Sequence, residues 1–160
     1  MEPNPFFKNL YFHLRPKDRF YQGGVADFDG DMKYYIQNSN LLNTFSDQYL
    51  KENDLLESTV EICDVPVRKL STLLDEVNLA NKEIDFMSID VEGLEFEVAC
   101  GNNWEKSRPK YLLFESSNPL DFDMQSNLTI YLKEREYSIV GKTLLSNQVG
   151  TIWFRANEVK

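Results

Sequence analysis

The sequence is short of the residues that bind zinc and that cross-link secreted proteins. Its 160 residues include one histidine, His13, and two cysteines, Cys63 and Cys100. Because His13 has no second histidine or cysteine nearby, it does not predict a zinc site and is expected to be an ordinary surface or packed residue. The cysteines lie in a strand-like run and next to Gly101. We expect them to be buried thiols in a reducing compartment.

Basic residues and long apolar runs are also scarce. Lysine and arginine number 17 against 26 aspartates and glutamates, which gives a net charge of −9. This excess of acid disfavours nucleic acid as a partner and favours a small molecule or a glycan. No apolar run approaches the roughly 20 residues that span a bilayer, and the N-terminus lacks the pattern of a signal peptide. We therefore expect a cytoplasmic protein without membrane association.

The chain has the length and composition of one α/β domain. Hydrophobic residues make up 42% of it, and no Gly-, Pro- or Ser-rich linker divides it. Periodicity and capping signals predict helices over 6–14, 46–53, from a cap at Ser71, after Gly93, and over 127–135. Strands are predicted over 19–28, 32–36, 59–70, 84–91, 110–115, 138–144 and 150–155, with 84–91 buried on both faces. Alternating strands and helices indicate a mainly parallel sheet with an antiparallel C-terminal edge.

Two turns are expected from short local signals. Asp29-Gly30 is a strong two-residue hairpin signal between strands 19–28 and 32–36, and a turn around Ser146-Asn147 is expected to join the last two strands. The acids of residues 27–31 resemble a calcium loop, but Met32 stands where that loop needs glycine and Asn38 where it needs glutamate. We therefore interpret this segment as a hairpin.

Acidic residues follow the ends of several predicted strands. Asp90 and Glu92 end strand 84–91, Glu115 ends strand 110–115, Asp27 lies near the end of strand 19–28, and Glu2 precedes the first helix. Ligands in an open α/β sheet bind beyond the carboxyl ends of its strands. If the strands are parallel, these acids converge along one rim.

Asp90 is the acid in this group that most favours a functional role. A carboxylate at the end of a buried strand is costly unless it binds a ligand, caps a helix or meets a cation. Glu95 and Glu97, a few residues on, are better explained as acids near a helix N-terminus, and Glu92 fits either role.

Two segments resemble the FkbM family of S-adenosylmethionine-dependent methyltransferases. Members have a motif like "TLD…IDFLKIDVEGAE", and this chain reads STLL at 71–74 and IDFMSIDVEGLE at 84–95. Cys100-Gly101, Arg108-Pro109 and Glu115 continue in step, and EPNP at 2–5 resembles the motif after the family's second strand.

The resemblance implies a Rossmann-like methyltransferase fold and S-adenosylmethionine as cofactor. It implies that Glu2 binds the cofactor's ribose, with Asp27 as a weaker candidate for the adenine amine. Asp90 would lie beside the transferred methyl group, as a base or an orienting group, with Glu92 and Glu115 as further acids at the site. The acceptor would be a hydroxyl of a sugar or another small molecule, with substrate loops at 38–58 and 116–126.

This chain departs from the family pattern in two places. Ser88 stands where a lysine is usual, and the Gly-rich first loop that precedes EPNP has no counterpart. The first strand and helix of the fold are therefore expected to be missing, as in the C-terminal part of a longer protein. An inactive shortened paralogue and a half-enzyme that pairs with another chain stay open, and an exposed sheet edge could support self-association.

Two other functions also stay open at this point. One is a non-catalytic α/β interaction module that no longer binds cofactor. The other is a metal-dependent hydrolase using the same acids, although nothing in the sequence requires a metal, and histidine ligands are lacking.

Overall fold

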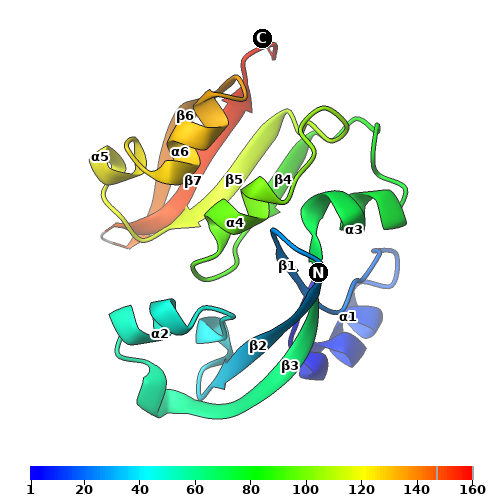
Figure 1. The fold of residues 1–160 in the computed structure, drawn as a ribbon, viewed down its shortest axis with the longest axis vertical. Coiled ribbons are helices and arrows are strands. Elements are labelled where there is room, and N and C mark those ends of the chain that lie inside the picture. The colour runs from blue at the N-terminus through cyan, green and yellow to red at the C-terminus, as the bar shows by residue number, and fades with distance from the viewer. Residues whose placement is uncertain (147, 160) are drawn as a thin grey trace.

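The strands form two mixed sheets in a computed structural model that describes residues 1–146 and 148–159 (Figure 1). The first sheet has the order β1-β3-β2, with β1 at Gly24–Ala26, β2 at Gly30–Gln37 and β3 at Thr59–Lys69. The second has the order β4-β5-β7-β6, with β4 at Phe86–Ile89, β5 at Tyr111–Ser116, β6 at Tyr137–Ser146 and β7 at Val149–Ala156. Asn147, in the expected final turn, lies outside the described residues.

Parallel and antiparallel pairs occur in both sheets. β1 runs parallel to β3, and β4 runs parallel to β5. β2 pairs antiparallel with β3, and β7 pairs antiparallel with both β5 and β6. A single parallel bridge joins Glu2 to Gln22 beside the first sheet. The α/β class and the antiparallel C-terminal edge are confirmed, whereas one mainly parallel sheet is not found.

The expected hairpin at Asp29-Gly30 is not formed. β3 lies between β1 and β2, and its Val67 is in register with Gly24 on one side and Gly30 on the other. The distant strand has replaced the local pairing because it offers β2 a longer ladder. Strand 19–28 is also shorter than predicted, since only Gly24–Ala26 is a strand.

Asp29 has a different role from the turn residue that was expected. Its carboxylate accepts hydrogen bonds from the Lys69 backbone N–H at 2.8 Å and from the Thr72 hydroxyl at 3.0 Å. It thereby ties the segment before β2 to the start of helix α3 (Leu70–Glu76), whose first turn has no side-chain cap. Ser71, the expected cap, lies inside this helix.

Short helices connect the strands. They are η1 (Pro5–Phe7), α1 (Lys8–Leu14), η2 (Asn40–Leu42), α2 (Asp47–Glu52), η3 (Leu56–Ser58), α3, α4 (Glu95–Cys100), α5 (Leu120–Asp123) and α6 (Asn127–Lys133). Ser46 caps α2 and Ser126 caps α6 through their side-chain oxygens. In the described part of the chain, no helix has the length and apolar character to cross a membrane.

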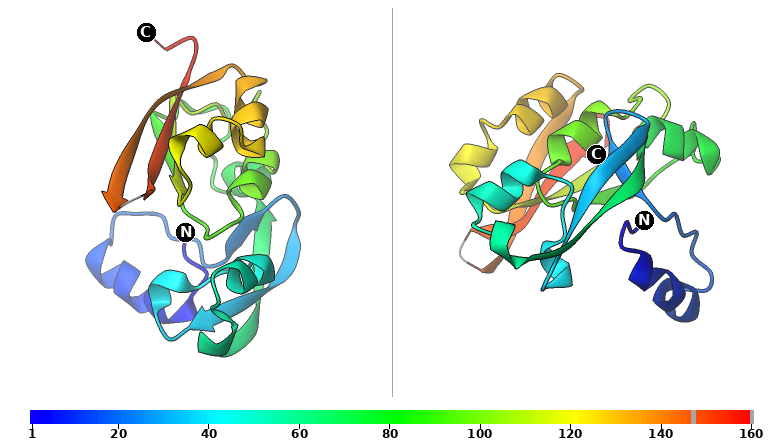
Figure 2. Two further views of the ribbon diagram at one scale, coloured as in Figure 1. Left: turned by 90° about the vertical axis from the view of Figure 1, so that its left-hand side faces the viewer. Right: turned by 60° about the horizontal axis from the view of Figure 1, so that its bottom comes forward.

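A shared core joins the two sheets. β5 and β7 alternate between buried and half-buried positions, and Leu112, Phe114 and Phe154 are fully buried between them and the helices. Val25 of β1 belongs to the same core. In Figure 1 and in the left view of Figure 2 the N-terminus lies between the two sheets, and Glu2 shares a cavity with Asp90, which follows β4.

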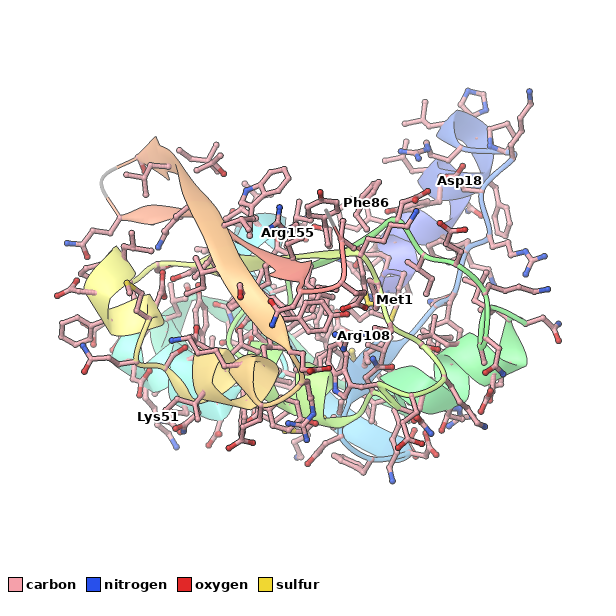
Figure 3. The ribbon with its side chains drawn as sticks, turned by 90° about the horizontal axis from the view of Figure 1, so that it is seen from above. Met1, Asp18, Lys51, Phe86, Arg108 and Arg155 are labelled. Carbon is pink, nitrogen blue, oxygen red and sulfur yellow. The ribbon has the colours of Figure 1, made fainter. Side chains whose placement is uncertain are left out.

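β4 is an edge strand and is more exposed than the sequence suggests. Phe86 is 65% exposed, and of the four residues of β4 only Ile89 is buried (Figure 3). The expectation of a strand buried on both faces is therefore wrong, because the face that carries Phe86 and Ser88 is open to solvent while Met87 and Ile89 on the other face are covered.

The remaining predictions about single residues have mixed outcomes. His13 is exposed on α1, as expected for a surface histidine. Cys63 and Cys100 are free thiols, but they are only half-buried.

Seen from above, Asp18 beyond α1 and Lys51 on α2 lie on opposite sides of the molecule (Figure 3).

Candidate functional site

The turn after β4 carries the central acids of the site. Glu92 has φ 49° and Gly93 has φ 100°, so two successive residues adopt positive φ angles. A positive φ is unfavourable for a glutamate, and such conformations persist where the surroundings hold them in place. The Thr44 hydroxyl donates to the Glu92 carbonyl oxygen at 2.8 Å, which ties this turn to the segment after β2.

Glu95 stabilises the same turn from the first turn of α4. Its Oε1 accepts hydrogen bonds from the backbone N–H groups of Val91 at 3.3 Å and Gly93 at 3.4 Å. Burial raises the pKa of Glu95, and these hydrogen bonds oppose that increase. These contacts agree with the structural role predicted for this residue.

Three of the predicted acids come together. Asp90 follows β4, Glu92 lies in the turn, and Glu115 is on β5 next to β4. One carboxylate oxygen from each lies within 4.8 Å of the others. The parallel pairing of β4 with β5 explains this convergence, since it places Ile89 opposite Phe114 and brings both strand ends to one side.

The carboxylate cluster consists of Asp90, Glu92 and Glu115, and burial and repulsion raise the pKa of two of its acids. Burial, followed by repulsion from Asp90 and Glu92, raises the pKa of Glu115 to about 7. Burial is also the main cause that raises the pKa of Glu92, with repulsion from Asp90 and Glu95 adding to it. Near neutral pH Glu115 is therefore partly protonated and can exchange a proton.

The cluster could also contact a cation. Its three oxygens are close enough together for a single divalent ion, and carboxylates are the ligands that magnesium and calcium prefer. Exposed or half-buried acids are also common in proteins without an ion.

Tyr49 of α2 lies beside the cluster. Burial and then its interaction with Glu92 raise the pKa of the Tyr49 hydroxyl, so it stays protonated and can donate to that carboxylate. The Tyr49 ring also packs against Gly93, where an added Cβ would lie 3.3 Å from the ring. α2 therefore forms one wall of the site.

A smaller cavity, here called the Glu2 cavity, lies on one side of the cluster and has a volume of about 220 Å³. Glu2, Asp90 and Glu92 supply its carboxylates. The other residues that line it are Met1, Pro3, Gly24, Val25, Tyr34, Asn40, Leu41, Asn43, Thr44, Phe45 and Val91. Acids that are 88 residues apart in the sequence thus face one space.

The EPNP segment is held firmly at this cavity. The Glu2 carboxylate accepts a hydrogen bond from the Asn4 backbone N–H at 2.8 Å, and burial raises the pKa of Glu2. Asn4 is fully buried, its Oδ1 accepts from the Phe6 N–H, and its Nδ2 donates to Asn40. These contacts fix the direction from which Glu2 enters the cavity.

A larger cavity, here called the Glu115 cavity, borders the cluster at Glu92 and Glu115 and has a volume of about 630 Å³. It is polar. Its wall includes Tyr49, Glu52, Asn53, Glu92, Gly93, Glu95, Phe96, Glu97, Glu115, Ser116, Ser117, Asn118, Asp123, Ser126, Asn127, Leu128, Thr129, Ile152 and Phe154. Glu92 therefore borders both cavities.

A buried ion pair supports the wall of the Glu115 cavity. Lys142 of β6 donates to Asp123 at 2.8 Å, to the Ser116 hydroxyl at 3.1 Å and to the Asn118 carbonyl oxygen at 2.5 Å. The side chains of Lys142 and Asp123 are only 4% and 7% exposed. These bonds anchor the segment after β5, one of the two expected substrate loops, to the C-terminal strands.

The structure does not bring every predicted residue to the site. Asp27 is exposed, lies outside both cavities, and sits by the C-terminal end of α4, where its Cα is 3.3 Å from a Cβ added to Gly101. Glu97 does line the Glu115 cavity from the first turn of α4, although only a helix-end role was expected.

Sequence reasoning missed Lys142, which supports the wall of the Glu115 cavity through Asp123. Lys142 lies in a strand whose pattern gives no sign of the distant Asp123.

Comparison with protein families supports the resemblance noted from the motifs. The family model described as "Methyltransferase FkbM domain" matches residues 1–139. No match was found among curated proteins or among solved structures. The match covers most of the chain, including Glu2, Asp90, Glu92 and Glu115. This protein therefore belongs to the FkbM methyltransferase family.

Proposed function

We propose that the protein is an S-adenosylmethionine-dependent methyltransferase that acts in the cytoplasm on a hydroxyl group of a sugar or another small molecule. The observation that carries this proposal is the meeting of two cavities at one carboxylate cluster. Glu2 and Asp90 border the smaller cavity, Glu115 borders the larger one, and Glu92 borders both. Such a layout suits a reaction between two ligands that approach from opposite sides.

The residues of the Glu2 cavity suit the adenosyl part of the cofactor. The Glu2 carboxylate can accept hydrogen bonds from ribose hydroxyls, as acids at this strand position do in related nucleotide-binding folds. When bound, S-adenosylmethionine supplies a methyl group, whose bond to sulfur breaks as a bond to the acceptor oxygen forms. Asp90 borders the same cavity as Glu2 and would orient the positively charged end by electrostatic attraction.

Glu115 is the residue that we propose as the base. Its pKa of about 7 lies near the pH at which a cytoplasmic enzyme works, which is the condition for efficient proton transfer. It borders the larger cavity and would accept the proton that the acceptor hydroxyl loses. Glu92 and Tyr49 would hold the Glu115 carboxyl group in position and maintain its charge state.

The polar wall of the Glu115 cavity supports a hydroxyl-rich acceptor. Asn53, Asn118 and Asn127 border it and offer amides that can donate to and accept from hydroxyl groups. The many carboxylates on this wall disfavour an anionic acceptor.

Isothermal titration calorimetry with S-adenosylmethionine and S-adenosylhomocysteine tests the proposal. We expect both to bind, and the positively charged methyl donor to bind more tightly because of the carboxylate cluster. Asp90→Asn should weaken binding of the methyl donor by about tenfold and affect the neutral product less. Asp121→Asn, on α5 outside both cavities, is the matched control and should leave both affinities unchanged.

The same titrations separate the alternatives. Binding without methyl transfer to any of a panel of sugars and other hydroxylated acceptors would support a non-catalytic module. Tight binding of Mn²⁺ together with no binding of either nucleoside would favour a metal-dependent hydrolase. The absence of binding to both nucleosides would overturn the proposed function.

A further inference from the structure

Helices cover the second sheet on one face only. In the left view of Figure 2, α4, α5 and α6 lie on one side of this sheet, and no helix of the described chain lies on the other side, here called the open face. The covered face carries the fully buried residues Leu112, Phe114 and Phe154. A sheet can leave one face in water when that face carries polar side chains, so the composition of the open face decides whether it needs a cover.

The strand register identifies the side chains of the open face. Phe86 of β4 lies opposite Tyr111 of β5, and Leu113 of β5 lies opposite Trp153 of β7. Phe86 is largely exposed, and Tyr111, Leu113 and Trp153 are half-buried. Aromatic and aliphatic side chains thus run across three adjacent strands, which is not the composition of a solvated face.

Helix α1 has an apolar side that the chain does not cover. Phe6, Leu10 and Leu14 recur every four residues along η1 and α1, so they share one side of this segment. They are 73%, 49% and 63% exposed, and neither buried core of the described chain includes a residue of α1. In the left view of Figure 2 and in Figure 3, α1 projects on the side of the open face. Each chain therefore presents both an uncovered helix and an uncovered sheet face.

The two surfaces match in size. At about 1.5 Å per residue, the stripe from Phe6 to Leu14 is about 12 Å long. The side chains on β4, β5 and β7 span three strands, which is about 10 Å at roughly 4.8 Å between neighbouring strands. Since helices with an apolar stripe are what ordinarily covers a sheet face, α1 of one chain fits the open face of another.

The total accessible surface also leaves room for an interface. The chain exposes 9836 Å², whereas a compact monomer of 18.7 kDa is expected to expose about 8,300 Å². The excess of about 1,500 Å² is larger than the roughly 800 Å² that each partner loses in an interface of standard size.

Charge favours a second copy of the chain over a membrane surface as the cover. Four basic residues and one acid lie between Lys8 and Arg19, which gives this segment a net charge of +3 in a chain of −9. The other residues therefore sum to −12, a charge that attracts the basic segment of a second copy and is repelled by anionic lipid. Glu83 and Asp85, which are exposed just before Phe86, carry part of this negative charge.

We propose that the protein forms a two-fold symmetric dimer in which η1 and α1 of each copy cover the open face of the other. The contact is reciprocal and closes after two copies, because both surfaces lie on the same side of the chain. It uses a helix and a sheet face, whereas the self-association expected from the sequence used a sheet edge. The dimer does not depend on the proposed activity, since the apolar residues of the two surfaces border neither cavity.

Sedimentation velocity of the unsubstituted chain tests the proposal. Between about 1 and 100 µM we expect the 18.7 kDa chain to exchange between monomer and dimer without larger species. Leu10→Asp and Phe86→Asp each place a charge in the contact and should raise the dissociation constant of the dimer about 30-fold or more. Both residues are exposed in the single chain, so the monomeric variants should remain folded by circular dichroism.

Ile130 provides the matched control. It is 50% exposed on α6, on the covered side of the second sheet. Ile130→Asp should leave the dissociation constant unchanged within about twofold. A mixture of Leu10→Asp and Phe86→Asp chains should recover dimer that neither variant forms alone, because a mixed pair has one contact that contains neither substitution.

Several outcomes would overturn the dimer. It is ruled out if the unsubstituted chain stays monomeric up to about 100 µM, or if Leu10→Asp and Phe86→Asp dimerise as tightly as the unsubstituted chain. Sedimentation of a monomeric chain with phosphatidylserine vesicles, lost in Leu10→Asp, would assign α1 to a membrane surface instead. Species that keep growing with concentration would indicate pairing at the edge of β4 rather than a closed dimer.

Discussion

Glu115 should destabilise the folded protein at alkaline pH. Replacing it with an uncharged residue should therefore raise the free energy of unfolding there. The pKa of Glu115 rises from an ordinary 4.5 to about 7 in the folded protein. The folded state therefore holds a proton that the unfolded state has lost between these two values. Stability falls as the pH rises through this window, and the penalty is fully present above pH 7.

The size of the penalty follows from the pKa difference and the exposure of the carboxyl group. At about 1.4 kcal/mol per pKa unit the difference sets an upper limit of ~3 kcal/mol. Glu115 is only half-buried, so solvent screening reduces the effect, and we expect about 1 kcal/mol. Glu115→Gln removes the charge and keeps the shape, so it should raise the free energy of unfolding by this amount at pH 8 and hardly at all near pH 4.5.

Urea denaturation followed by circular dichroism at the two pH values measures the difference. Glu105→Gln replaces an exposed glutamate away from the cluster and is the matched control. The reasoning is refuted if Glu115→Gln is less stable than the unsubstituted protein at pH 8. It is equally refuted if the gain is the same at both pH values, because the cause would then not be an ionised carboxylate.

Two further predictions concern the framework of the site, and urea denaturation measures both. Lys142→Met leaves the buried Asp123 charge without an opposite charge and should lower the free energy of unfolding by about 3–5 kcal/mol. Adding Asp123→Leu to the same chain should restore most of that free energy. A loss below about 1 kcal/mol for Lys142→Met would contradict a stabilising ion pair. Gly101→Ala places a Cβ 2.3 Å from the Ala26 carbonyl oxygen and should cost about 1–3 kcal/mol, whereas Gly141→Ala meets nothing within 4 Å and should cost less, so equal losses would contradict the packing argument.

Elements with strong local signals could be predicted from the sequence. α6 begins after Ser126, whose side chain caps it, and its observed range matches the expected helix to within a few residues. β5 and β7 follow the expected strands closely, because alternating apolar residues such as Leu112 and Phe114 face one core. In these segments the local pattern and the tertiary packing favour the same structure.

Elements whose partners are distant in the sequence could not be predicted in the same way. The Asp29-Gly30 signal is strong for an isolated hairpin, yet β3 pairs with both flanking strands and Asp29 hydrogen-bonds to Lys69 and Thr72. The exposure of Phe86 likewise depends on which face of β4 the rest of the chain covers, which the sequence of β4 does not encode.

The candidate site was predictable where it depends on strand ends. Asp90 and Glu115 come together because parallel neighbouring strands end on the same side, a rule that needs only the strand assignments. Lys142 belongs to the wall of the site through contacts with the distant Ser116, Asn118 and Asp123, for which the sequence has no periodic signal. Residues of this second kind become visible only in three dimensions.

The position of Glu92 between the two cavities has a thermodynamic consequence. Its carboxylate borders both spaces and interacts electrostatically with Asp90. A positive ligand in one cavity changes the ionisation of this shared wall, and that change alters the affinity of the other cavity. By linkage the effect is reciprocal, so under the proposed function the affinities for donor and acceptor would depend on each other and on the pH. One residue in a tight turn thus couples the two cavities.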